Sequence, residues 1–107
     1  MVDKKFRKAL DAYLNEVEES SVLLDNPSFD KSIVGITDDY RIVYDYDKMV
    51  DELSKDDHID PIEAEDFISY DTMRAIAYMQ DPKPIILTHT KKKIIDFYYE
   101  EEKKGEK

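Results

Sequence analysis

Apolar residues in the first part of the chain recur at steps of three and four positions, the spacing that places side chains on one face of an α-helix. This pattern predicts an amphipathic helix between Asp3 and Glu19, followed by a loop around the turn signal Asn26-Pro27-Ser28. The residues that form the apolar face are Phe6, Leu10, Tyr13, Leu14 and Val17.

Two short runs rich in Ile, Val and Tyr, at residues 32–37 and 41–46, predict a β-hairpin whose strands are joined by the segment 38–40. Gly35 lies in the middle of the first run, which indicates a bulge or a close backbone neighbour. Side chains two positions apart in a strand share a face. The residues expected to do so are Val34 with Ile36, and Ile42 with Tyr44 and Tyr46.

Aspartates indicate where the next helices begin, because an Asp side chain can accept hydrogen bonds from the unpaired amides of a first helical turn. Asp45 or Asp47 is placed to cap a helix that ends in the polar run 54–58. The Asp60-Pro61 pair is a second start, with Glu63 positioned to complete a capping box.

A third cap is expected at Asp71, opening a helical segment that the prolines of residues 81–84 end. Residues 85–87, Ile-Ile-Leu, predict a buried strand that joins the hairpin as a third member of the sheet. The residues expected to face the core from the helix after Pro61 are Ile62, Phe67 and Ile68.

The tail of the chain fits either a helix or a strand. Residues 94–99 contain good strand formers, whereas Lys103, Lys104 and Gly105 form a helix-stop signal, so we favour a helix over residues 91–100. The expected architecture is one α+β domain over residues 1–100 with a frayed charged tail at 101–107. It comprises an N-terminal helix, a β-hairpin, two or three short helices and a third strand, with the helices packed on one face of the sheet.

Composition agrees with a single small domain, since 41% of the 107 residues are hydrophobic and 39% are charged. The absence of cysteine excludes disulfides, thiolate zinc sites and a cysteine nucleophile. The N-terminus has no uninterrupted apolar signal region, and no segment approaches the ~20 apolar residues that span a bilayer. We therefore expect a cytoplasmic protein without a membrane partner.

The net charge of −10 is concentrated between residues 38 and 71, where thirteen Asp or Glu face only Arg41, Lys48 and Lys55. Several of these acids are expected to cap helices. Those left over form a candidate surface for binding a partner, and they are Asp38, Asp39, Asp51, Glu52, Asp56, Asp57, Glu65 and Asp66.

The acids around His58 also invite a metal site, but their spacing does not match known ones. An EF-hand loop needs Gly at position six and Glu at position twelve, and a loop starting at Asp56 has Pro61 and Phe67 there. No catalytic motif is present either, so we predict no cofactor, no metal and no catalytic residue. A metal-binding or enzymatic module using Asp56, His58 and Asp60 is kept as an alternative.

The charge pattern disfavours direct binding to DNA or RNA, because such surfaces neutralise phosphates with Lys and Arg. Helical carboxylates such as Asp47 with Asp51 can instead imitate a phosphate backbone. We therefore predict a non-enzymatic acidic protein that engages a basic, nucleic-acid-binding protein, as a DNA mimic or inhibitor. A homo-oligomer held by tyrosine-rich faces is left open, and Arg74 is expected to pair with Asp71 or a neighbouring carboxylate.

Part of the chain resembles a family of short uncharacterised proteins of bacteria and their prophages. The resemblance spans residues 32–87, although those proteins tend to have Asn at the position of Asp71 and Pro at that of Ala77. It implies no activity and no site residue, but it does imply a mobile-element setting, in which small acidic inhibitors such as anti-CRISPR proteins occur. The segments that carry the resemblance are Ile33–Thr37, Val43–Met49, Phe67–Ala75 and Pro84–Ile86.

Overall fold

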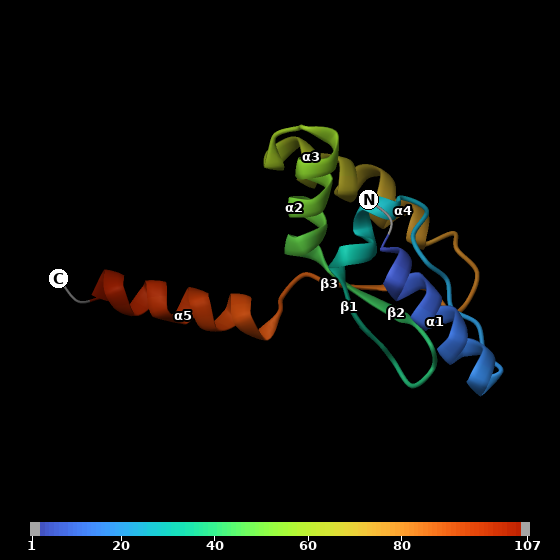
Figure 1. Cartoon of the computed structure of the whole chain (residues 1–107). Coiled ribbons are helices and arrows are strands. Elements are labelled where there is room, and N and C mark those ends of the chain that lie inside the picture. The colour runs from blue at the N-terminus through green and yellow to red at the C-terminus, as the bar shows by residue number, and fades with distance from the viewer. Residues whose placement is uncertain (1–2, 106–107) are drawn as a thin grey trace.

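The computed structural model describes residues 3–105 and confirms the α+β fold, with an N-terminal helix and a hairpin (Figure 1). Short 3-10 and π-helical segments, here η1 and η2, accompany the regular elements. In chain order the elements are α1 (Lys4–Val17), η1 (Pro27–Ser32), β1 (Ile33–Ile36), β2 (Ile42–Asp45), α2 (Tyr46–Asp57), α3 (Pro61–Phe67), η2 (Ile68–Thr72), α4 (Met73–Ile76), β3 (Ile85–Leu87) and α5 (Lys91–Gly105).

The hairpin contains a bulge at the position that the mid-strand glycine indicated. Strands β1 and β2 are antiparallel, and their register shifts between Ile33 and Gly35, so Val34 is the extra residue. The expected shared face of Val34 and Ile36 is therefore wrong, because Val34 is 47% exposed while Ile33 and Ile36 pack against the core.

Strand β3 completes the sheet as predicted, but the expected burial is wrong, because Ile85 and Ile86 are half-buried and Leu87 is 39% exposed. It runs parallel to β2, and the strand order is β1-β2-β3. Central strand β2 alternates between buried and half-buried side chains. Its residues Ile42 and Tyr44 are fully buried and share a face, as expected, whereas Tyr46 already begins α2. The core therefore lies against the face of the sheet that carries Ile42 and Tyr44.

Three aspartates cap helices. Asp3 accepts a hydrogen bond from the Phe6 amide, Asp45 from the Lys48 amide and Asp60 from the Ile62 amide, at 3.0, 3.2 and 2.8 Å. The caps at Asp45 and Asp60 confirm two of the predicted helix starts. Helix α2 ends at Asp57, with His58 as its C-cap, within the predicted polar run.

The predicted cap at Asp71 is wrong, because the chain stays helical from Pro61 to Ile76. Asp71 lies inside η2, a wider π-helical turn between α3 and α4, and the flanking residues Phe67 and Thr72 have helical dihedrals and no side-chain cap.

The inward stripe of this long helix falls at every fourth residue, on Ala64, Ile68, Thr72 and Ile76, all buried or half-buried. The prediction that Ile68 faces the core is confirmed. The same prediction for Ile62 and Phe67 is wrong, since they are 68% and 43% exposed.

The core gathers side chains from α1, η1, β2, α2, α3, η2 and the loop before η1. Its fully or nearly buried apolar members are Leu10, Leu24, Phe29, Ile42, Tyr44, Met49, Val50, Leu53, Ala64 and Ile68.

An ion pair between the half-buried Arg7 and the buried Asp30 joins α1 to η1. The Arg7 guanidinium donates two hydrogen bonds to Asp30, from Nε to Oδ2 at 2.7 Å and from Nη2 to Oδ1 at 2.8 Å. Asp30 is only 3% exposed, and its hydrogen bond raises the pKa of Arg7 above the ordinary value. Nearby, the Tyr44 hydroxyl accepts a hydrogen bond from the Leu24 amide at 2.9 Å, and burial raises the pKa of Tyr44 to about 12.

Helix α5 extends away from the rest of the molecule (Figure 1). With α5 included, the molecule measures 57 × 30 × 27 Å along its principal axes. The favoured C-terminal helix is thus confirmed over residues 91–100. The helix continues to Gly105. The expected fraying of residues 101–107 stays a prediction, and residues 106–107 lie outside the described residues.

Candidate functional site

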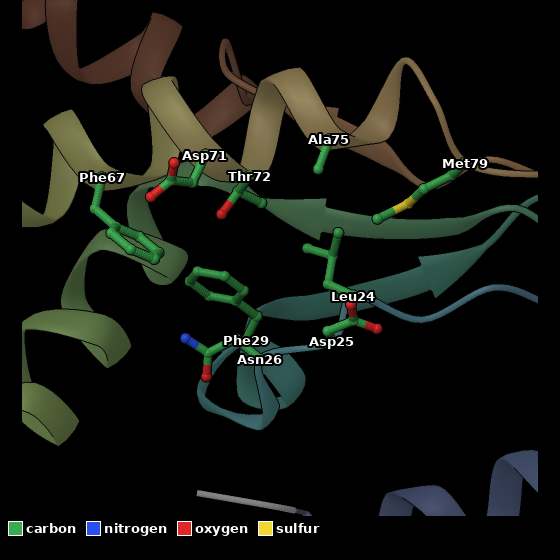
Figure 2. Close-up of a pocket in the computed structure, with 9 residues that line it drawn as sticks. All are labelled: Leu24, Asp25, Asn26, Phe29, Phe67, Asp71, Thr72, Ala75 and Met79. Atoms are coloured by element: carbon green, nitrogen blue, oxygen red, sulfur yellow. The ribbon is translucent and has the colours of Figure 1, made fainter.

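A pocket of about 180 Å³ opens between the segment 24–29 and the helical segment 67–79 (Figure 2). Figure 2 shows residues from these two segments facing each other across it. The loop side is formed by Leu24, Asp25, Asn26 and Phe29, and the helical side by Phe67, Asp71, Thr72, Ala75 and Met79.

Two hydrogen bonds fix the loop side of the pocket, one to strand β2 and one within the loop. The Leu24 amide is bound to the buried Tyr44 hydroxyl, and the Asn26 side chain caps η1 by accepting from the Ser28 amide at 3.0 Å. Phe29, from η1, is 1% exposed and belongs to the core. The pocket therefore has one wall that is fixed before any ligand binds.

The pocket combines an apolar lining with two exposed carboxylates. Leu24, Phe67 and Met79 supply apolar surface, and Asp25 and Asp71 carry the charges. Within residues 3–105 neither carboxylate takes part in an ion pair. Asp25 lies on the loop side of the pocket and Asp71 on the helical side (Figure 2), so a cationic group that enters would find a carboxylate on either wall that no cation of residues 3–105 neutralises.

The size of the pocket limits what can enter it. Small-molecule sites usually measure about 300–1,000 Å³, so a volume of about 180 Å³ corresponds to a single side chain or a small amine. Lys and Arg bury an apolar stem and keep a charged head near polar groups. A basic side chain thus matches both the lining and the carboxylates.

The acidic residues singled out from the sequence do not form one surface. Asp38 and Asp39 lie in the hairpin connection, at the opposite end of the body from α2 and α3 (Figure 1). Asp39 also accepts a hydrogen bond from the Thr37 hydroxyl, which in turn accepts from the Arg41 amide at 3.0 Å. Asp39 thus helps to shape the hairpin connection, and neither acid lines the pocket.

The acids of α2 are divided between two flanks of the helix. Successive helical residues are rotated by ~100°, so residues four apart lie close together on one flank. Lysines occupy the outward strip between the flanks. The two acidic pairs are Asp47 with Asp51 and Glu52 with Asp56, and the lysines between them are Lys48 and Lys55.

The first of these flanks faces lysines of the same chain. Asp47 and Asp51 line a charged cleft with Lys92 and Lys93 of α5, and Lys93 Nζ lies 3.5 Å from Asp47 Oδ1. Asp51 is therefore partly balanced from within the molecule and offers less charge to an outside partner.

The remaining candidate acids belong to α2 and α3, which pack against each other. Glu52 is half-buried and Asp56 has an interaction of its own. Asp57, Glu65 and Asp66 are exposed. Four of the eight residues, Asp56, Asp57, Glu65 and Asp66, thus occupy the exposed sides of this helix pair.

Exposed apolar and aromatic side chains follow the same helical segment as the pocket. Ile62 and Phe67 of α3, Tyr70 of η2 and Tyr78, two residues beyond α4, are all exposed. Tyr and other aromatic residues combined with charged neighbours are typical of protein-binding surfaces. Ile62 and Phe67 were predicted to face the core, whereas Tyr70 and Tyr78 belong to the tyrosine-rich faces that were left open as an interface.

Arg74 does not form the expected ion pair within the described residues. Its guanidinium carbon lies 5.3 Å from the centre of the Tyr70 ring, a cation–π arrangement. Asp71 is thereby left available at the pocket, on the adjoining helical turn.

The alternative metal site receives no geometric support. His58 is exposed and ends α2 in the left-handed conformation, with φ 54° and ψ 44°. Within residues 3–105 no three side chains of His, Asp, Glu or Cys are grouped so that they could share a metal ion.

The pocket residues were missed from the sequence because they come from two segments about forty positions apart. The turn signal at Asn26-Pro27 was the available hint, since it fixes a loop beside apolar residues.

Among residues 3–105, no helix has the length and hydropathy to span a membrane. Comparison with models of protein families, with curated proteins and with solved structures gave no match.

Proposed function

We propose that this protein is a non-enzymatic binding protein that holds a basic partner protein through the pocket of Figure 2 and the acidic helical surface beside it. The observation that carries the proposal is the apolar pocket with the carboxylates of Asp25 and Asp71. In this arrangement one Lys or Arg of the partner enters the pocket as an anchor. The exposed acids of α2 and α3 attract the basic partner electrostatically.

The partner class that we infer is a nucleic-acid-binding protein. Such proteins present clustered Lys and Arg for phosphates, and an acidic protein that occupies this surface acts as an inhibitor or DNA mimic. The lysines on α2 interrupt its carboxylate rows, so the pocket is the centre of the proposed contact and a long phosphate-like ladder is not required. The resemblance to prophage proteins is consistent with such an inhibitor.

A titration with small amides tests the pocket directly. Nα-acetyl-lysine amide and Nα-acetyl-arginine amide are added to the isotope-labelled protein, and Nα-acetyl-norleucine amide serves as the neutral counterpart of lysine. We expect the basic amides to shift backbone resonances in the segments 24–29 and 67–79, and the norleucine amide to shift them much less. Equal shifts for all three amides, or shifts confined to other segments, would contradict a cation-binding pocket.

A capture experiment tests the partner class. The immobilised protein is incubated with nuclease-treated bacterial lysate at low salt, and bound proteins are released with high salt and identified. We expect nucleic-acid-binding proteins that are also displaced by short duplex DNA. Asp25→Asn with Asp71→Asn should lose this capture.

The matched control removes the same charge elsewhere. Asp11→Asn with Asp38→Asn changes two exposed acids outside the pocket, and capture should persist. If both double variants lose capture equally, total charge rather than the pocket is responsible. If duplex DNA displaces nothing, the proposed DNA mimicry is wrong.

A further inference from the structure

Helix α5 presents its whole surface to solvent. Every side chain from Lys91 to Lys104 is exposed, including large apolar residues that are 42–64% exposed. Lys93 joins the start of the helix to the body, and beyond this point the helix extends away from it (Figure 1). A helix of 15 residues is marginal in water when nothing packs against it. We therefore expect another molecule to pack against the apolar side chains of α5.

Three of the apolar residues of α5, Ile94, Ile95 and Tyr98, lie on one stripe, and Phe97 and Tyr99 flank it on its two sides. Ile95 and Tyr98 are three positions apart, and Ile94 lies beside them at a spacing of four from Tyr98. The same stripe continues to Lys91 at one end and to Glu102 at the other. The hydrogen bond from the Tyr98 hydroxyl to Glu102 Oε1, 2.8 Å long, shows that these two side chains lie together.

We propose that α5 is a self-association helix that pairs in antiparallel orientation with α5 of a second copy of this chain. The argument is charge complementarity within one stripe. The steps from Lys91 to Ile95 and from Tyr98 to Glu102 are both four residues. The four positions of the stripe are therefore symmetric about its midpoint. Antiparallel pairing places Ile95 opposite Tyr98 of the second copy and Lys91 opposite its Glu102.

Parallel pairing of the same helices is disfavoured. It would place each lysine of the first turn beside the same lysine of the second copy, and each glutamate beside the same glutamate, which is repulsive. In a two-fold antiparallel contact, Lys91 of each copy pairs with Glu102 of the other. The same ion pair therefore forms twice, as expected for a closed dimer.

The charges at the start of α5 are also unfavourable for the isolated helix. Lys91, Lys92 and Lys93 occupy its first turn, where the helix dipole favours acidic side chains. Lys92 and Lys93 pair with Asp96 and Asp47 of the same chain, at 2.8 and 3.5 Å. Lys91 has no such partner within residues 3–105, and a glutamate near the end of the opposing helix would supply one.

Sedimentation equilibrium over a wide concentration range tests the pairing. We expect the average mass to rise from the chain mass of 12.6 kDa towards twice this value. Tyr98→Glu should weaken dimerisation by about tenfold or more, because it places a charge opposite Ile95. Tyr78→Glu is the matched control, since Tyr78 is an exposed tyrosine of the body, and it should leave dimerisation unchanged.

Charge reversal tests the orientation. Lys91→Glu alone and Glu102→Lys alone each place like charges together in the antiparallel pair. The helix dipole favours both changes, because one puts an acid in the first turn and the other a base near the last turn. Both should weaken dimerisation, and the double variant should restore it. Failure of the double variant to restore dimerisation would overturn the antiparallel register.

Two results overturn the proposal as a whole. One is a mass of 12.6 kDa at every concentration, including the case in which the monomer sediments with anionic phospholipid vesicles and α5 is a membrane-binding helix. The other is a dimer that neither Tyr98→Glu nor the charge reversals weaken. Both measurements are independent of the pocket, so their failure leaves the proposed binding function unaffected.

Discussion

The helices in the body of the molecule, residues 3–90, and helix α5 are all amphipathic, but they differ in whether other elements cover their apolar residues. In the body, the apolar faces of α1 and α2 enter a shared core with β2 and the long helix that follows. In α5 the apolar stripe has no such cover. The difference shows that amphipathic periodicity predicts a helix and one apolar face, and that it does not predict whether the same chain covers that face.

The largest expected effect comes from removing a core aromatic residue and comparing it with one on α5. Phe29→Ala should lower the free energy of unfolding by about 3–5 kcal/mol, because it leaves a cavity in the core. Phe97→Ala should change it by less than about 0.5 kcal/mol, because Phe97 lies on an exposed helix. Urea unfolding of both variants measures this, and equal losses would mean that α5 packs on the body.

Ion pairs offer the next contrast between the two regions. Arg7→Ala should cost about 3 kcal/mol, because it leaves the buried carboxylate of Asp30 without its cation. Lys92→Ala removes an exposed pair with Asp96 on α5 and should have no measurable effect on the unfolding of the body. Chemical denaturation of both variants gives the comparison. A loss in Arg7→Ala as small as that in Lys92→Ala would show that Asp30 is solvated.

The pH dependence of unfolding isolates Tyr44. Because the folded protein holds the Tyr44 proton more tightly than the unfolded chain, its contribution to stability is complete below pH 10 and is lost as pH rises towards 12. A rise in pKa from 10.0 to about 12 corresponds to roughly 3 kcal/mol. The stability of the wild type should therefore fall more than that of Tyr44→Phe between these pH values. Parallel curves would contradict a buried, neutral phenol.

The smallest expected effect concerns the end of a body helix. His58 adopts φ 54°, a conformation that glycine accepts without strain. His58→Gly should stabilise the body by about 0.5 kcal/mol, since the relief of strain exceeds the added flexibility of the unfolded chain. Lys55→Gly, inside α2, is the control and should destabilise by about 1 kcal/mol. Thermal unfolding would distinguish the two signs.

Local signals in the sequence predicted much of the fold. The caps at Asp45 and Asp60 and the bulge beside Gly35 depend on neighbouring residues only, and each was found where expected. Asp71 was misassigned because a cap signal also occurs inside a continuous helix, where the π-helical turn accommodates it.

The candidate site depended on contacts that local patterns do not contain. The pairing of Arg7 with Asp30 joins positions 23 residues apart, and the pocket joins the loop at Asp25 to the helix at Asp71. Periodicity predicted helices correctly but could not show that Phe67 lines a surface pocket. The acidic segment likewise looked uniform in sequence, although the fold separates the connection between β1 and β2 from α3.

The bulge in β1 also affects how this sheet meets other sheets. Strands β1 and β3 form the two edges of the sheet, and exposed edges can pair with strands of other molecules and start aggregation. The bulge at Val34 distorts one edge, and the other is three residues long and preceded by Pro84. Neither edge is a good template for adding strands, which keeps a small, open sheet from growing into fibres.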